Sequence, residues 1–156
     1  MYKQILVPLD GSELAEQVLP HAQGLAKTYE ATIHILRAFT HDHDGLMGLH
    51  SKVEIGLTTE TSFDLQRQYG EAQKTTITEY IEHVRDRIKN EGIDVKVEAL
   101  EGSAYEHIID YAKNNNIDLI AMTTHGHGGL RRMLTGSVTD RVIRGSEIPV
   151  LVINCL

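Results

Sequence analysis

The chain has 156 residues, of which 41% are hydrophobic and 24% are charged. This balance is that of a globular protein and excludes the disordered and fibrous classes, and the length fits one domain over residues 1–156. The net charge of −7 argues against a nucleic-acid partner, because proteins that bind the phosphate backbone present basic patches. No apolar stretch approaches the roughly 18 to 20 residues that cross a bilayer, so no membrane partner is expected.

Cysteine usage and the first residues predict a reducing compartment. The single cysteine, Cys155, cannot form an intramolecular disulfide. The chain leads directly into a β-prone run, without the apolar region and cleavage site of a signal peptide. We therefore expect a cytoplasmic protein, with Cys155 as an inert thiol because no activating base is evident near it.

The first forty residues predict a strand, a helix and a second strand. Residues 4–7 form a β-prone run that ends at about Pro8. Ser12 is a candidate N-cap for a helix that runs to about Tyr29. The apolar positions of that helix recur at spacings of three and four: Leu14, Val18, Ala22, Leu25 and Tyr29. Residues 31–39 are β-branched and apolar and predict the second strand.

The middle of the chain predicts a connection, a helix and a strand. The stretch from Thr40 to about Gly70 lacks periodicity and is interpreted as a long variable connection. Helical spacing returns after it, at Ile77, Ile81, Val84 and Ile88, and the helix ends at the glycine of residues 90–92. Residues 95–99 alternate between apolar and charged types, which indicates a strand with one solvated face, near the sheet edge.

The last third of the chain predicts two further helices, each followed by a strand. Residues 103–106 match a capping box, and the helix after them directs Ile108, Ile109 and Ala112 toward the sheet and ends at residues 114–116. Residues 119–122 form the continuous apolar run typical of a central parallel strand. The final pair is a short helix with Val138, Val142 and Ile143, and a strand over residues 150–153 that begins after Pro149.

This element order predicts a single-domain α/β fold of Rossmann-like or flavodoxin-like type, with a five-stranded, mostly parallel sheet and helices on both faces. In such sheets, ligands bind beyond the carboxyl ends of the strands, where the strand order reverses. Residues that carry chemistry are therefore expected in the loops at that edge.

The glycine-rich segment 123–137 follows a buried strand and precedes a helix, which is the setting of a phosphate-binding loop. Glycines let backbone amides approach an anion closely. At Gly136 and Ser137, free amides and the positive end of the helix dipole can point at phosphate oxygens, and the Ser137 hydroxyl adds a donor or reaches Mg²⁺. The dinucleotide fingerprint and the P-loop are both absent. Backbone physics alone leaves a tight turn with a capped helix as the alternative.

The spacing of these glycines resembles that of the universal stress protein family. The family's mark is Gly-x-x-Gly, nine further residues, and then Gly-Ser or Gly-Thr. Its second and third parts are matched by Gly126, residues 127–135, and Gly136 with Ser137. The runs 5–12, 138–142 and 148–152 also resemble family segments. Thr123 stands where the family's ATP-binding pattern has its first glycine.

The resemblance implies a strand order of 3-2-1-4-5 and an adenine nucleotide, ATP or a relative, bound with Mg²⁺. It implies that Asp10, with Pro8 and Leu9, lies beside the adenine and ribose, and that Ala38 and Met122 line the base pocket. Phosphates are expected at Gly126, Gly136, Ser137 and Val138. Thr123 is counted among the nucleotide-binding residues because its side chain can crowd the ribose.

Simpler interpretations stand beside several of these residues. Asp10 is also a candidate helix cap, and His125 and His127 are polar loop residues as well as neighbours of any phosphate. Residues 41–44 carry metal-ligand types, but adjacent ligands lack the spacing of a structural zinc site, so no metal site is expected. Arg131 and Arg132 offer either phosphate donors or a solvated basic pair.

No nucleophile, base and acid can be combined into a catalytic site from this sequence, so no catalytic residues are assigned and any ATP hydrolysis is expected to be slow. We expect a regulatory stress-response factor that pairs as a homodimer through the apolar edge run 150–153. The first alternative is an interaction module of the same fold that has lost nucleotide binding, which Thr123 favours. The second is a phosphohydrolase that uses the histidine-rich loop.

Overall fold

The structure, a computed structural model, describes residues 1–40, 59–125 and 138–155. Five parallel strands form one sheet in the order β3-β2-β1-β4-β5, as predicted. The strands are β1 (Gln4–Pro8), β2 (Thr32–Phe39), β3 (Val95–Glu101), β4 (Leu119–His125) and β5 (Val150–Cys155). The alternating strand β3 lies at the sheet edge, which confirms the prediction for residues 95–99.

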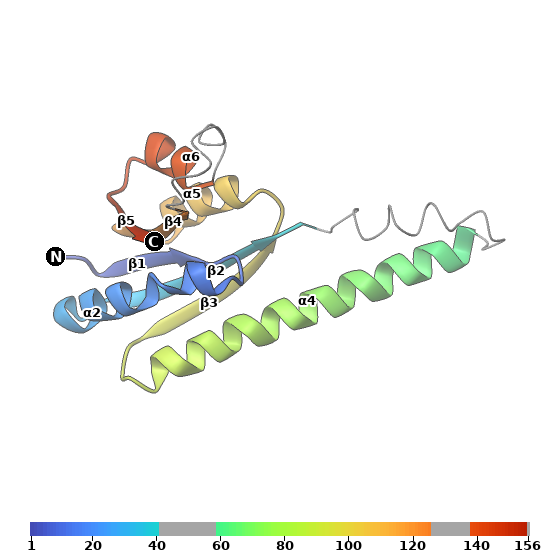
Figure 1. The fold of residues 1–156 in the computed structure, drawn as a ribbon, viewed down its shortest axis with the longest axis horizontal. Coiled ribbons are helices and arrows are strands. Elements are labelled where there is room, and N and C mark those ends of the chain that lie inside the picture. The colour runs from blue at the N-terminus through green and yellow to red at the C-terminus, as the bar shows by residue number, and fades with distance from the viewer. Residues whose placement is uncertain (41–58, 126–137, 156) are drawn as a thin grey trace.

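Helices cover both faces of the sheet (Figure 1). They are α1 (Glu13–Glu16), α2 (Leu19–Tyr29), α4 (Thr59–Lys89), α5 (Ala104–Asn114) and α6 (Val138–Gly145). One core cluster joins the sheet to α1, α2 and α4, and includes Ile5, Val18 and Val84. The other joins it to α5 and α6, and includes Leu6, Ile108 and Val142. The doubly wound fold therefore follows the predicted alternation of elements.

The single helix predicted from Ser12 to Tyr29 is two helices. Ser12 caps α1 as predicted, since its Oγ accepts a hydrogen bond from the Ala15 N–H at 3.1 Å. The break falls between Glu16 and Leu19 because Pro20 has no N–H and its ring would clash with the carbonyl four residues earlier. Near the start of α2 the same proline is favourable, because the first N–H groups of a helix have no partner within it.

The variable connection predicted from Thr40 to about Gly70 is shorter than expected, because α4 begins at Thr59. Residues 41–58 lie outside the described residues. The predicted apolar stripe from Ile77 to Ile88 is buried against the sheet, while described residues nearer the start, such as Lys74, are exposed. Figure 1 shows that this earlier part projects beyond the sheet. It carries no apolar stripe, and periodicity therefore did not reveal it.

Two local predictions need correction. Ser103 is the N-cap of α5, but its side chain makes no capping hydrogen bond, so the predicted capping box is not formed. The strand predicted over residues 119–122 continues to His125, because β-branched Thr123 and Thr124 suit a strand and pair with Ile153 and Asn154 of β5. Within the described residues, no helix is both long enough and apolar enough to cross a membrane.

A pocket at the carboxyl edge of the sheet

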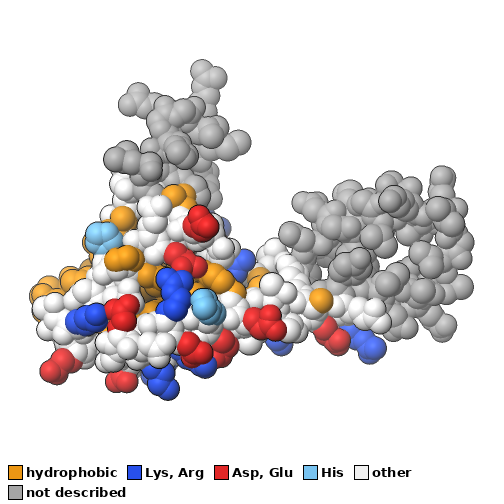
Figure 2. Space-filling view, turned by 60° about the horizontal axis from the view of Figure 1, so that its bottom comes forward, with side chains coloured by type: hydrophobic (Ala, Val, Ile, Leu, Met, Phe, Trp, Pro, Cys, Tyr) orange, Lys and Arg blue, Asp and Glu red, His pale blue; other side chains and the backbone are white. Residues whose placement is uncertain are grey.

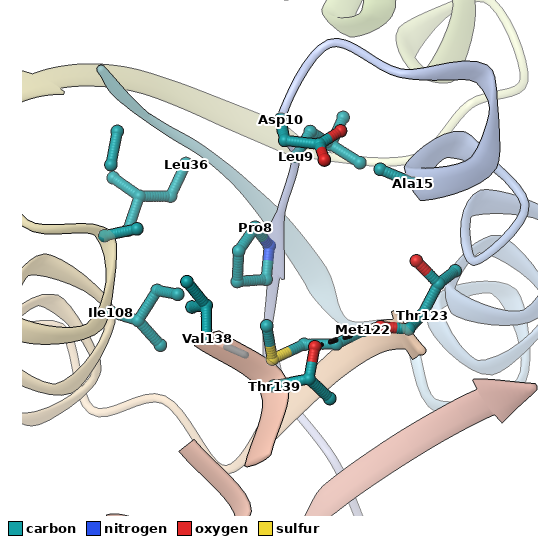
Figure 3. A pocket seen from close by; sticks show the side chains of 12 residues that line it. Pro8, Leu9, Asp10, Ala15, Leu36, Ile108, Met122, Thr123, Val138 and Thr139 are labelled. Atoms are coloured by element: carbon teal, nitrogen blue, oxygen red, sulfur yellow. Dashed lines mark hydrogen bonds between the residues drawn. The ribbon is translucent and has the colours of Figure 1, made fainter. Parts of the chain in front are cut away.

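A pocket of about 210 Å³ opens at the carboxyl ends of β1, β2 and β4. The chain order reverses here, since β2 and β3 extend the sheet on one side of β1, and β4 and β5 on the other. This is the position at which doubly wound sheets bind ligands. Its lining comes from three strands, three helices and the loop after β1: Pro8, Leu9, Asp10, Ala15, Leu36, Ala38, Ala104, Ile108, Met122, Thr123, Val138 and Thr139 (Figure 3).

Most of the lining is apolar and belongs to the core. Leu36 and Ile108 are 1% and 2% exposed, and Met122 is 7% exposed. These side chains reach the cavity from β2, α5 and β4 respectively, and each is packed against neighbouring elements of the core. Walls of this kind suit a flat apolar group such as a nucleobase, while a few polar groups fix its orientation.

Asp10 is the acidic group of the pocket, and Figure 3 shows it at the loop after β1. Burial raises the pKa of Asp10, but hydrogen bonds from Ser12 and the positive charge of Arg37 outweigh burial and lower the pKa below its usual value. The Ser12 N–H donates to Asp10 Oδ1 at 2.9 Å, and the Ser12 hydroxyl donates to the same oxygen at 2.6 Å. Asp10 is therefore an ionised hydrogen-bond acceptor at neutral pH.

The loop that carries Asp10 is supported from the other side by Arg37. Gly11 has a φ of +84°, and a Cβ at this position would lie 3.4 Å from Arg37 Nη2. The Arg37 Nη1 donates to the Leu9 carbonyl at 3.5 Å. The side chain thus packs against the loop backbone, and its charge favours the ionised form of Asp10.

Behind this loop, α1 is fastened to α4 by an ionic cluster. Glu16 accepts a hydrogen bond from the Tyr80 hydroxyl at 3.0 Å and another from Arg87 Nη1 at 2.8 Å. Burial raises the pKa of Tyr80, and the hydrogen bond to Glu16 raises it further, so the phenol stays protonated. These contacts join the part of α4 that packs against the sheet to α1, the helix that follows the loop carrying Asp10.

The first turn of α6 is joined to β4 at the pocket. The Thr139 hydroxyl donates to the Thr123 carbonyl at 3.0 Å, drawn as a dashed line in Figure 3. Thr123 is half-buried, and Val138 is 36% exposed. The strand before the glycine-rich segment and the helix after it therefore meet at the same cavity.

Seven of the ten predicted site residues line this one pocket: Pro8, Leu9, Asp10, Ala38, Met122, Thr123 and Val138. Gly126, Gly136 and Ser137 lie outside the described residues, and so do His127, Arg131, Arg132 and residues 41–44. His125 ends β4, and its side chain lies outside the description. That the lining residues contact a nucleotide stays a prediction.

Sequence reasoning missed the wall formed by α5. Ala104 and Ile108 line the pocket from that helix, although Ile108 was predicted to face the sheet. The signal was available, because a helix that follows a parallel strand begins at the carboxyl edge where ligands bind. The described residues contain no cluster of three or more His, Cys, Asp or Glu side chains that could hold a metal ion.

The fold and the pocket define the class of protein: a doubly wound, flavodoxin-like α/β domain with a cavity at its topological switch point. Residues 1–154 match the model of the universal stress protein family. The chain belongs to that family.

Two relatives from Methanocaldococcus jannaschii are similar over nearly the whole chain. Universal stress protein MJ0531 is 31% identical over 99% of this chain and 83% of its own length. Universal stress protein MJ0577 is 32% identical over 99% of this chain and 96% of its own length.

Solved structures agree with the fold. The structure of MJ0577, a hypothetical protein whose biochemical function was assigned from its structure, has a TM-score of 0.76 at 28% identity and covers 100% of this chain and 98% of that one. A universal stress protein solved in complex with cAMP has a TM-score of 0.69 at 19% identity, with coverage of 98% and 97%. The latter similarity concerns the fold.

Proposed function

We propose that the chain binds an adenine nucleotide, ATP or a relative, in the pocket at the carboxyl edge of the sheet. The observation that carries the proposal is the shape and chemistry of that cavity: apolar walls from Leu36, Ile108 and Met122, with the ionised Asp10 at one side. The complex of a universal stress protein with cAMP supports an adenine nucleotide as the ligand class. The base would lie between Ala38 and Met122, and the ribose hydroxyls would donate to Asp10.

The phosphates would extend from the pocket toward residues 126–137, whose glycines and Ser137 carry the family spacing. The first turn of α6 at Val138 adds the positive end of the helix dipole. Among the described residues that line the pocket, Asp10 is the one carboxylate. A Mg²⁺ ion would therefore be held chiefly by phosphate oxygens and water, with Ser137 as an additional ligand.

The biological role we infer is regulatory: a cytoplasmic stress-response factor that changes its interactions when a nucleotide is bound, with at most slow hydrolysis of ATP. It would act as a homodimer. In the described residues, β5 pairs with β4 and with no other strand, which leaves an apolar edge over residues 150–153 for a second copy.

The second candidate is an interaction module of the same fold without nucleotide binding. Thr123 favours it, because a β-branched side chain lines the pocket where the family's ATP-binding pattern has glycine. In that case the segment from Thr40 to about Gly70 would present the partner surface. The two candidates differ in one measurable property, which is direct binding of ATP or AMP by the purified protein.

Ala38→Phe separates the candidates, because a benzyl group in the pocket would occupy the space proposed for the base. Isothermal titration calorimetry should detect binding of ATP with Mg²⁺, and of AMP, by the wild-type protein, and a loss of at least tenfold in affinity in the variant. Ala72→Phe is the matched control, since Ala72 is exposed on α4 away from the pocket lining. Equal binding by wild type and Ala38→Phe would show that the nucleotide binds elsewhere. No binding by the wild type would favour the interaction module.

A second variant tests the phosphate end of the site. Gly136→Val adds a β-branched side chain where backbone amides are expected to meet phosphate, so it should weaken ATP binding more than adenosine binding. Mass spectrometry of ligand released from freshly purified protein would identify the nucleotide that the protein carries.

A further inference from the structure

Among the described residues that line the pocket, one side-chain hydrogen-bond donor is not used by any of them. Of the twelve lining residues, three have polar side chains, namely Asp10, Thr123 and Thr139. Asp10 is ionised and can only accept. The Thr139 hydroxyl already donates to the Thr123 carbonyl at 3.0 Å. Within the described part of the chain, the Thr123 hydroxyl makes no hydrogen bond, so its proton is available to a ligand.

The Thr123 side chain is held in place for such a contact. Its backbone lies in β4, in register with Ile153 of β5. Its carbonyl is fixed by Thr139, and a β-branched side chain has few χ1 rotamers. Figure 3 shows the hydroxyl oxygen directed into the space that the lining residues surround. A fixed donor loses little conformational freedom when a ligand acceptor arrives.

The position of this donor selects the ligand group that it can meet. Thr123 lies near the carboxyl end of β4, and the hydrogen bond from Thr139 brings the first turn of α6 against it. The start of a helix carries partial positive charge, so the space beside Thr123 favours an anionic oxygen. Asp10, on the loop after β1, favours the ligand's donors instead.

We propose that Thr123 is a specificity-determining residue whose hydroxyl donates a hydrogen bond to the α-phosphate of the bound nucleotide. The inference rests on the proposed function and deepens it. A glycine at this position would supply no such donor, so the departure from the family pattern changes what the site recognises rather than closing it. The site then discriminates between a nucleotide and its nucleoside partly through this one side chain.

The test compares AMP with adenosine, which lacks the phosphate, on wild type and four variants by calorimetry. Thr123→Val keeps the shape and removes the hydroxyl, and should lower AMP affinity about tenfold or more while leaving adenosine affinity unchanged, because hydrogen bonds to charged groups are the stronger kind. Thr123→Ser restores a hydroxyl and should stay within about threefold of wild type for AMP, since the donor is retained. Thr124→Val is the control, because its side chain points to the opposite face of β4.

Two results would overturn the role of Thr123 while leaving nucleotide binding intact. One is AMP affinity in Thr123→Val equal to that of the wild type. The other is tighter AMP binding by Thr123→Gly, which would show that the side chain obstructs the ligand. A wild-type protein that binds neither AMP nor adenosine would overturn the proposed function itself, and the role of Thr123 with it. Melting temperatures of all variants identify any that fail to fold.

Discussion

The Nε2 of His34 lies 2.6 Å from the Oε1 of Gln4 inside the core. Because an amide oxygen only accepts, the Nε2 carries the proton and donates. The Nδ1 then accepts from the Tyr111 hydroxyl, 3.0 Å away. His34 belongs to β2 and is fully buried, and in this arrangement a neutral imidazole has a hydrogen-bond partner at each ring nitrogen.

This arrangement predicts an acid-sensitive fold. Burial, together with the positive charge of Lys96, lowers the pKa of His34 from 6.5, its usual value in an unfolded chain, to about 4. Since the folded pKa is the lower one, the unfolded state binds more protons between these values. Stability from this residue is therefore full above pH 6.5 and declines as the pH falls toward 4, by about 3 kcal/mol in total.

Urea unfolding of wild type and His34→Gln across this pH range measures the effect. The variant lacks the titrating group, so the difference in unfolding free energy between the two proteins should shrink as the pH falls from 7 to about 4. Carboxylates and the other histidines are common to both proteins and cancel in the difference. A difference that stays constant with pH would contradict a depressed pKa at His34.

Tyr111→Phe should destabilise the protein by about 1–3 kcal/mol, because it leaves the buried Nδ1 of His34 without a donor. Tyr29→Phe is the matched control. In the described residues the Tyr29 hydroxyl makes no hydrogen bond, and its ring packs against Tyr2 at the surface. The control should change the unfolding free energy by less than about 0.5 kcal/mol. Similar losses in both variants would mean that the buried hydrogen bond to His34 adds nothing to the effect of removing a tyrosine hydroxyl.

The buried polar group also illustrates what sequence could not predict. The run of β2 identifies a strand because its neighbours Ile33 and Ile35 are apolar and β-branched, but nothing local indicates that His34 enters the core. Its partners are far along the chain, with Tyr111 77 positions away. A pattern within one element reports which face is buried, whereas a hydrogen-bonding partner depends on how distant elements pack.

The position of the pocket was predictable from the sequence, but the contacts between distant elements within it were not. Asp10 follows the first strand, and Met122 ends the strand predicted over residues 119–122. The carboxyl ends of parallel strands meet at one edge of the sheet, so both residues could be assigned to one site from the order of elements. The charge balance of Asp10 could not, because it depends on Arg37 of β2 lying against the loop after β1. The start of α4 at Thr59 was missed because helices that project from the core lack an apolar stripe.

Two glycines should respond in opposite directions to the same substitution. Gly11→Ala should destabilise the protein by about 1–2 kcal/mol, because its φ of +84° is strained for a residue with a Cβ. The new methyl would also contact Arg37 Nη2. Gly24→Ala should stabilise by about 0.5–1 kcal/mol, because Gly24 lies within α2 and a Cβ there meets nothing within 4 Å.

Thermal denaturation of the two glycine variants under identical conditions provides the measurement. Gly11→Ala should also weaken AMP binding, since the loop backbone holds Asp10, whereas Gly24→Ala should leave it unchanged. Stabilisation by both substitutions would mean that the loop after β1 relaxes into another conformation without cost. Unchanged AMP affinity in Gly11→Ala would show that AMP binding does not depend on the conformation of the loop after β1.

The edge strand β5 is the element through which the proposed homodimer would pair. The Pro149 carbonyl accepts from the Ile120 N–H at 3.0 Å and so faces β4. Because these groups alternate along a parallel strand, the Val152 N–H faces away from β4 and is available to a second copy. Val152→Pro removes that donor, while the hydrogen bonds between β5 and β4 are kept.

Light scattering after gel filtration should find a dimer for the wild type at micromolar concentration and a monomer for the variant. A wild-type monomer, or a variant that dimerises as well as the wild type, would exclude pairing through this edge.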